Sequence, residues 1–220
     1  MEPASHAVRI AADTVWLDAD HVPSHPGKGT VIFAHGSGSG RKSPRNRQVA
    51  VELSNRGLGT LLLDLLAESE ARVDALTAEY RFNIPLLTER LLAATNWLVA
   101  RPGVEEAKLG YFGASTGGAV AMMAAARRVE VVGAIVLRGA LSDLGDSVAA
   151  GIRCPTLILV GELDDHIQRA NESTMRLLKC EKELAIIPGA SHLFEEPGAL
   201  ERVAERTADW FDRYLSRQER

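Results

Sequence analysis

Short runs of apolar residues alternate with longer segments of helical periodicity along the chain. Each run is bounded by turn-forming residues, which is typical of buried strands. The segments expected to form strands are Val8–Ile10, Thr14–Leu17, Thr30–Ala34, Gly59–Leu63, Lys108–Gly113, Val131–Leu137, Thr156–Val160 and Leu184–Ile187. Because helical patterns lie between most of them, we expect a mostly parallel sheet with helices on both faces, and an antiparallel edge from the first two strands.

The helical segments have clear start signals and apolar stripes. Ser43-Pro44 begins one helix, with serine as the N-cap and proline at the first helical position. In the helix expected from Asn83 or Ile84 to Ala100, Leu87, Leu91, Ala94 and Leu98 repeat at spacings of three and four. Residues 65–81 are charged and loosely patterned, so we expect an excursion over the sheet there. The sequence leaves open whether it forms a lid.

Composition places the chain among ordinary globular proteins. Its 220 residues, 46% hydrophobic and 25% charged, fit one α/β domain spanning 1–220. The net charge of −4 argues against a nucleic-acid partner. No run of about 18 apolar residues is present, which argues against a membrane span. We expect a cytoplasmic monomer or homodimer, with Cys154 and Cys180 reduced.

The most specific local pattern is Gly113-Ala114-Ser115-Thr116-Gly117, which matches G-x-S-x-G. It follows an expected strand and opens an expected helix. A nucleophile elbow needs this placement, because the turn between strand and helix exposes the serine hydroxyl at the sheet edge. Ser115 is therefore the candidate nucleophile.

A serine nucleophile needs a base, and the base needs a group that orients it. Gly161-Glu162-Leu163-Asp164-Asp165 directly follows a strand, and His192 lies in the loop after the last strand. The order serine, acid, histidine is that of enzymes with a nucleophile elbow. We assign His192 as base and Asp164 as its orienting acid. The alternatives left open are Asp165, with Asp164 capping the next helix, and Glu162.

Acyl transfer also requires donors for the oxyanion. One is expected to be the backbone N–H of Thr116, which follows the nucleophile. His35-Gly36-Ser37-Gly38 follows an earlier strand, and Ser37 or Gly36 can supply the second N–H. Gly36 is also a candidate substrate-binding residue, because glycine lets the backbone approach a ligand closely. For His35 we favour a structural role bonded to the loop backbone.

Two arginines are candidate substrate-binding residues. Arg138 follows a strand at the active edge, where it can hold a substrate carboxylate or pair with Asp143 or another acid. Arg41 begins a basic cluster beside the expected oxyanion loop. This cluster suits an anionic acyl group or a phosphate, but a solvated helix start with ion pairs is the favoured reading. No metal-ligand or nucleotide-binding spacing is present, so neither a metal nor a cofactor is expected.

These motifs together resemble the α/β-hydrolase superfamily, in particular its dienelactone hydrolase-like branch. The group most similar carries Phe33-Ala34-His35-Gly36-Ser37-Gly38-Ser39-Gly40 followed by Ser43-Pro44-Arg45-Asn46-Arg47, and also occurs fused to phosphoribosyltransferase domains. The resemblance runs from about Val8 to Phe211. It implies an eight-stranded sheet with a minimal cap or none, a Ser-Asp-His triad and metal-free hydrolysis. Dienelactone hydrolases proper use a cysteine nucleophile, whereas this chain has Ser115.

The sequence thus predicts a serine hydrolase that cleaves carboxylic esters of small molecules, with lactones and thioesters as further candidate substrates. An amidase or acyltransferase would use the same three residues. A binding protein without catalysis is the alternative from a different class, because a fold does not determine a function.

Overall fold

The computed structural model describes residues 5–101 and 108–217, and their strands form one eight-stranded sheet. The strands are β1 His6–Ala12, β2 Val15–Val22, β3 Thr30–Ala34, β4 Gly59–Leu63, β5 Leu109–Ala114, β6 Val132–Arg138, β7 Thr156–Gly161 and β8 Lys182–Ile187. Their order across the sheet is β1-β2-β4-β3-β5-β6-β7-β8. The first two strands pair antiparallel with each other, and β2 pairs antiparallel with β4. All other neighbours are parallel, so the expected architecture is confirmed.

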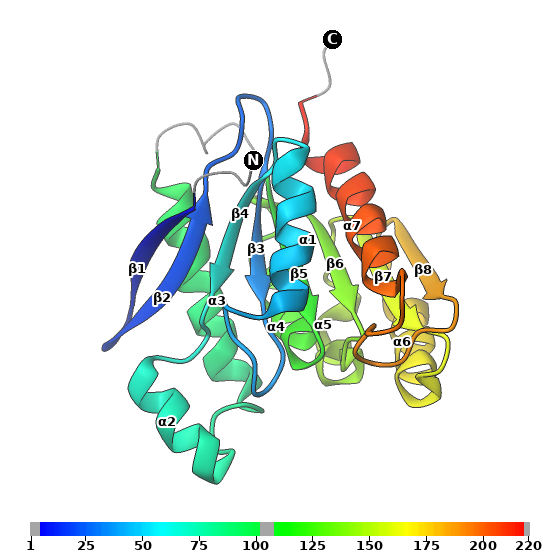
Figure 1. Ribbon diagram of the computed structural model, residues 1–220, viewed down its shortest axis with the longest axis horizontal. Coiled ribbons are helices and arrows are strands. Elements are labelled where there is room, and N and C mark those ends of the chain that lie inside the picture. Colours follow the sequence, from blue (N-terminus) through cyan, green and yellow to red (C-terminus); the bar gives the residue numbers. More distant parts are fainter. Residues whose placement is uncertain (1–4, 102–107, 218–220) are drawn as a thin grey trace.

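Helices cover both faces of the sheet (Figure 1). They are α1 Pro44–Asn55, α2 Glu68–Thr77, α3 Ile84–Val99, α4 Thr116–Arg127, α5 Asp146–Ala149, α6 Asp165–Leu177 and α7 Ala199–Leu215, with a short 3₁₀ turn at Ser142–Gly145 before α5. One hydrophobic core lies under α1 and α7, and a second lies under α3, α4, α5 and α6. Strands β3 to β6 are buried along their whole length because they contribute to both cores.

The leading hairpin is longer than the sequence indicated. Strand β2 continues to Val22 because its second half pairs with β4, from Ala19 opposite Leu63 to Val22 opposite Thr60. Its polar residues Asp18 and Asp20 interrupt the apolar pattern that marks a strand. Ion pairs with Arg41 and Arg47 satisfy them.

The expected excursion contains a helix that the pattern did not indicate. In Figure 1, α2 lies apart from the sheet, beyond the end to which the parallel strands point. Its chain is held by Asp74, which accepts hydrogen bonds from the backbone N–H groups of Tyr80 at 2.8 Å and Arg81 at 2.9 Å. A second anchor joins Glu70 to Arg90 of α3 at 2.9 Å. The Asp74 bonds therefore brace the excursion internally, and the Glu70–Arg90 pair fixes it to α3.

Candidate active site

Ser115 occupies a strained turn between β5 and α4. Its φ of 51° and ψ of −121° lie in a region that residues with a side chain rarely adopt. The flanking glycines permit the turn: a Cβ on Gly113 would lie 2.5 Å from the carbonyl oxygen of Gly117, and a Cβ on Gly117 would collide with the carbonyl of Ala34. The G-x-S-x-G spacing is therefore a packing requirement, and it presents Ser115 at the carboxyl edge of the sheet.

His192 and Asp164 meet at this edge. The Nδ1 of His192 lies 2.6 Å from Oδ2 of Asp164, whose side chain is 14% exposed. Two backbone hydrogen bonds join their loops, from Leu163 to Ala190 at 2.9 Å and from Glu162 to Ile187 at 3.0 Å. Because a carboxylate only accepts, Nδ1 carries the proton and Nε2 is left to act as the base.

The other acids considered from the sequence have different positions. Asp165 is the first residue of α6 and is exposed. Glu162 accepts a hydrogen bond from the backbone N–H of Gly189 at 2.7 Å, so it supports the histidine loop. Asp164 stands directly before α6, which is where it would have to be to cap this helix. Its carboxylate nevertheless contacts His192. Of the three acids, Asp164 is the one whose carboxylate contacts His192.

Ser115 and His192 both line a cavity of about 220 Å³. The loop after β3 forms one of its walls, through Gly36, Ser37 and Ser39. Gly36 lies directly against the elbow, since a Cβ at this position would be 3.0 Å from the Cβ of Ser115. This close approach places the loop backbone beside the nucleophile, as an oxyanion donor requires.

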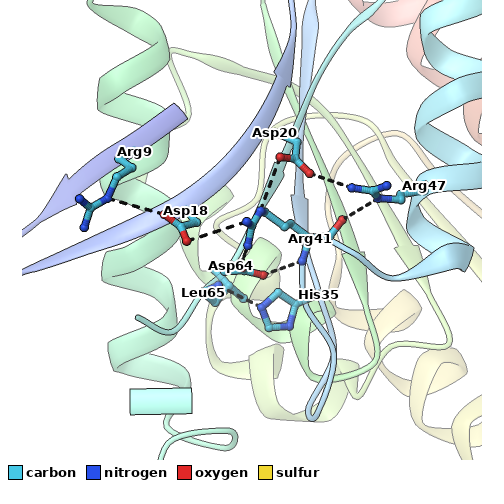
Figure 2. A network of polar contacts seen from close by, with 8 residues as sticks. All are labelled: Arg9, Asp18, Asp20, His35, Arg41, Arg47, Asp64 and Leu65. Carbon is cyan, nitrogen blue, oxygen red and sulfur yellow. Dashed lines mark hydrogen bonds and ion pairs between the residues drawn. The ribbon is translucent and has the colours of Figure 1, made fainter. Parts of the chain in front are cut away.

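His35 holds this loop in place. Its Nδ1 donates to the carbonyl of Gly36 at 2.9 Å. Its Nε2 accepts from the backbone N–H of Leu65 at 3.0 Å (Figure 2). Burial lowers the pKa of His35 below the usual histidine value. The ring therefore stays neutral, which suits an acceptor at Nε2, and this geometry matches the structural role favoured from the sequence.

Arg41 is surrounded by carboxylates, as Figure 2 shows. Its guanidinium pairs with Asp64, lies 3.5 Å from Asp20 and 3.9 Å from Asp18, and its backbone N–H donates to Asp64 at 2.6 Å. These bonds attach the start of the α1 loop to β2 and to the end of β4. The charge of Arg41 is thereby balanced within the protein, which favours the ion-paired reading of this cluster.

Arg138, unlike Arg41, has no carboxylate paired with its guanidinium among the described residues. It ends β6, is 8% exposed and lines the 220 Å³ cavity with Ser115 and His192. Its Nε and Nη1 are buried and have no hydrogen-bond partner among the residues that the structure describes. Asp143, the partner considered from the sequence, is exposed in the 3₁₀ turn. Burial, followed by the charge of Arg45, lowers the pKa of Arg138 to about 10, so it remains a cation at neutral pH.

A larger cavity of about 550 Å³ adjoins the first. The two share Gly36, Ser37 and Ser39, and Thr116, which follows Ser115, lines the larger one. Helix α2 and its flanks form the opposite wall, through Leu66, Ala71, Ala75 and Arg81. Of the oxyanion candidates, Ser37 lines both cavities and Thr116 lines the larger one.

Within residues 5–101 and 108–217, no cluster of histidine, cysteine, aspartate and glutamate could hold a metal ion. None of the helices in this part of the chain has the length and apolar character needed to cross a membrane.

Comparison with known proteins identifies the family. The model of the dienelactone hydrolase family matches residues 22–216. The chain belongs to the dienelactone hydrolase family. It is also 44% identical over 194 residues to a putative phosphoribosyl transferase of Mycobacterium tuberculosis, an alignment that covers 88% of this chain and 43% of that protein. The chain thus spans less than half the length of this relative.

Solved structures agree with membership of the dienelactone hydrolase family. A dienelactone hydrolase from Anabaena variabilis is 47% identical and superposes with a TM-score of 0.95, over 98% of this chain and all of the other. Est1E from Butyrivibrio proteoclasticus is 17% identical, with a TM-score of 0.79 over 92% and 96% of the two chains, and shares the fold. The fold is that of the α/β hydrolases, and the family supports a hydrolase function.

The structure adds Asn46 and Leu193, which sequence reasoning did not single out and which line the same cavity as Ser115. Arg45, a member of the basic cluster noted from the sequence, lines it as well, in the first turn of α1. The Ser43-Pro44 start signal placed the α1 N-terminus in the sequence, but only the sheet order brings it next to the elbow, because β3 lies beside β5.

Proposed function

We propose that this protein is a serine hydrolase that cleaves carboxylic esters of small molecules through an acyl-enzyme. The observation that carries the proposal is the 2.6 Å contact between His192 and Asp164, in a cavity that His192 shares with Ser115. The strained backbone of Ser115 supports it, because such strain persists mainly at functional sites. Membership of the dienelactone hydrolase family supports a hydrolase independently.

In the first step, the Oγ of Ser115 attacks the ester carbonyl while His192 accepts its proton at Nε2. The backbone N–H groups of Ser37 and Thr116 bind the oxyanion that forms. The intermediate then collapses, and His192 returns the proton to the departing alkoxide. The acyl group stays bound to Ser115.

In the second step, water attacks the acyl-serine and gives its proton to His192. Collapse releases the carboxylic acid and restores the Ser115 hydroxyl. Asp164 keeps the ring oriented and stabilises the imidazolium in both steps. Lactones and thioesters can follow the same sequence, since only the leaving group differs.

The two adjoining cavities fit a substrate whose reacting carbonyl lies at their junction. One side of the scissile bond occupies the 220 Å³ cavity and the other lies under α2 in the 550 Å³ cavity. Pockets for small molecules commonly measure ~300–1,000 Å³, so the combined space suits a small ester.

The test is labelling with a fluorophosphonate probe, read by intact mass, followed by hydrolysis of short-chain 4-nitrophenyl esters. Wild type should gain one adduct, and Ser115→Ala should gain none and lose roughly five to six orders of magnitude in kcat. Ser69→Ala, at an exposed serine on α2, is the matched control and should behave like wild type. A folded wild-type protein that forms no adduct and hydrolyses no ester would instead favour a binding protein on this fold.

A further inference from the structure

The buried arginines of this chain differ in how their charge is balanced. Arg90, buried in α3, donates to Glu70 and to the carbonyl of Ala12. Arg41, which is half-buried, is paired with three carboxylates. For the guanidinium of Arg138, which is buried like that of Arg90, the described residues provide neither an ion pair nor a hydrogen bond. Buried charges are ordinarily paired, so Arg138 needs an explanation other than fold stability.

Aromatic rings are the groups that hold the Arg138 guanidinium. Its central carbon lies 5.9 Å from the ring centre of Phe112 and 5.8 Å from that of Phe194. Such contacts attract a cation weakly and leave its N–H groups without acceptors. Because Arg138 lines the cavity of Ser115, an anion that enters this cavity would meet a guanidinium that is already positioned.

Arg45 adds a second positive charge to the same cavity. Its Nη1 is 3.0 Å from Glu195, whose side chain is 63% exposed, so water screens this pair. Its Nε is buried and has no partner in the described part of the chain. Two guanidiniums thus border the cavity, and a single exposed carboxylate balances them in part.

Two helix N-termini reinforce the positive potential. Helix α1 begins at Pro44, next to Arg45, and α4 begins at Thr116, next to Ser115. Each helix has 12 residues and therefore a substantial dipole, with about half a positive charge at its N-terminus. The cavity lies between these two ends, where N–H groups favour oxygen anions.

We propose that Arg138 and Arg45 bind a phosphoryl group carried by the substrate, which makes this hydrolase specific for phosphorylated small-molecule esters. A phosphate monoester carries a charge of about −1.5 to −2 and three acceptor oxygens, whereas a carboxylate carries one charge and two oxygens. Two guanidiniums and two helix ends match the phosphate better. This inference rests on the proposed ester hydrolysis at Ser115, and the small cavity places the phosphoryl group only a few bonds from the scissile carbonyl.

The first experiment is calorimetric titration with inorganic phosphate, in a buffer free of phosphate. Wild type should bind it saturably, and Arg138→Met and Arg45→Met should each weaken binding at least tenfold. Arg72→Met, at an exposed arginine on α2, should bind like wild type. The melting temperature of Arg138→Met should equal or exceed that of wild type, because methionine removes a buried charge that no described residue balances. A lowered melting temperature with unchanged phosphate affinity would assign Arg138 a structural role and overturn the proposal.

Two further titrations test the phosphoryl assignment and separate it from the proposed function. Acetate is titrated in parallel, and binding of acetate as tight as that of phosphate would overturn the phosphoryl assignment. Ser115→Ala is titrated to separate this inference from the proposed function. If this variant binds phosphate while the wild type neither forms the probe adduct nor cleaves esters, the proposed function is wrong and the anion site stands. Ester hydrolysis without phosphate binding would defeat the anion site alone.

Discussion

Asp164 and Asp165 are adjacent in the sequence but have different surroundings in the folded chain. Asp164 is 2.6 Å from His192, and Asp165 is exposed at the start of α6. In Asp164→Asn, the side-chain amide can donate to Nδ1 of His192, which leaves the ring proton on Nε2 and removes the base. We therefore expect Asp164→Asn to lower kcat/KM for a reactive ester by ~10⁴-fold.

Asp165→Asn is the matched control for this prediction, since an exposed substitution changes little and about twofold is the expected limit. The measurement is steady-state kinetics of both variants on the same ester. The reverse ranking would show that Asp165, not Asp164, orients the histidine during catalysis.

At the residue scale, the sequence could place Ser115 in the turn between β5 and α4 because the G-x-S-x-G motif fixes backbone geometry. The glycines around Ser115 are required by contacts with neighbouring backbone, so the pattern and the turn are inseparable. The surroundings of Arg138 could not be predicted in this way. Whether it meets an acid depends on side chains from other elements, and Asp143, its nearest candidate in the sequence, points to solvent.

At the scale of elements, α2 shows why a helix can escape pattern analysis. Its buried residue is Asp74, so it has no apolar stripe facing a core. Polar anchors hold it instead, and these depend on residues distant in the sequence, such as Arg90. By contrast, α3 has Leu87, Leu91 and Leu98 buried at helical spacing, and its predicted start and end agree with the structure to within one residue.

Asp74 is the critical anchor of the segment that walls the 550 Å³ cavity. Burial alone would raise the pKa of its carboxyl, but hydrogen bonds from Arg81 and Tyr80 and the charge of Arg81 hold the pKa below the usual value. Asp74→Ala leaves these donors unpaired, at a cost of about 2 kcal/mol in local stability. We expect faster hydrogen exchange across residues 68–81 and a raised KM for esters with bulky groups, with kcat changed less.

Arg72→Ala provides the control for the α2 prediction. Its pair with Glu68 is solvent-exposed and contributes little. Exchange and kinetics of this variant should match wild type. Unchanged exchange in Asp74→Ala would mean that packing of the excursion, not its polar anchors, keeps it in place.

For the whole molecule, acid should reduce stability before the carboxylates titrate. Burial lowers the pKa of His35, and burial with the charges of Arg101 and His6 lowers that of His21 to about 4. In the unfolded chain both titrate near ~6.5, so the unfolded state binds more protons below that pH. The free energy of unfolding should be fully retained above pH ~6.5 and fall progressively toward pH ~4.

Denaturant unfolding at a series of pH values tests this dependence. His35→Gln and His21→Gln should each remove part of the slope between pH ~6.5 and ~4, because each removes one group that takes up a proton on unfolding. His35→Gln should also be less stable than wild type at pH 7.5, since the bond to Gly36 is lost. If the free energy of unfolding of both variants depends on pH as strongly as that of wild type, other groups cause the acid sensitivity.

One short loop, residues 36–39, borders both cavities. The side chains beyond it belong to different parts of the chain: α1 and β6 on one side, α2 on the other. Substitutions in α2 can therefore alter one half of the substrate without disturbing recognition of the other. Such a modular layout allows relatives that keep the same chemistry to diverge in what they cleave, by changing one compartment at a time.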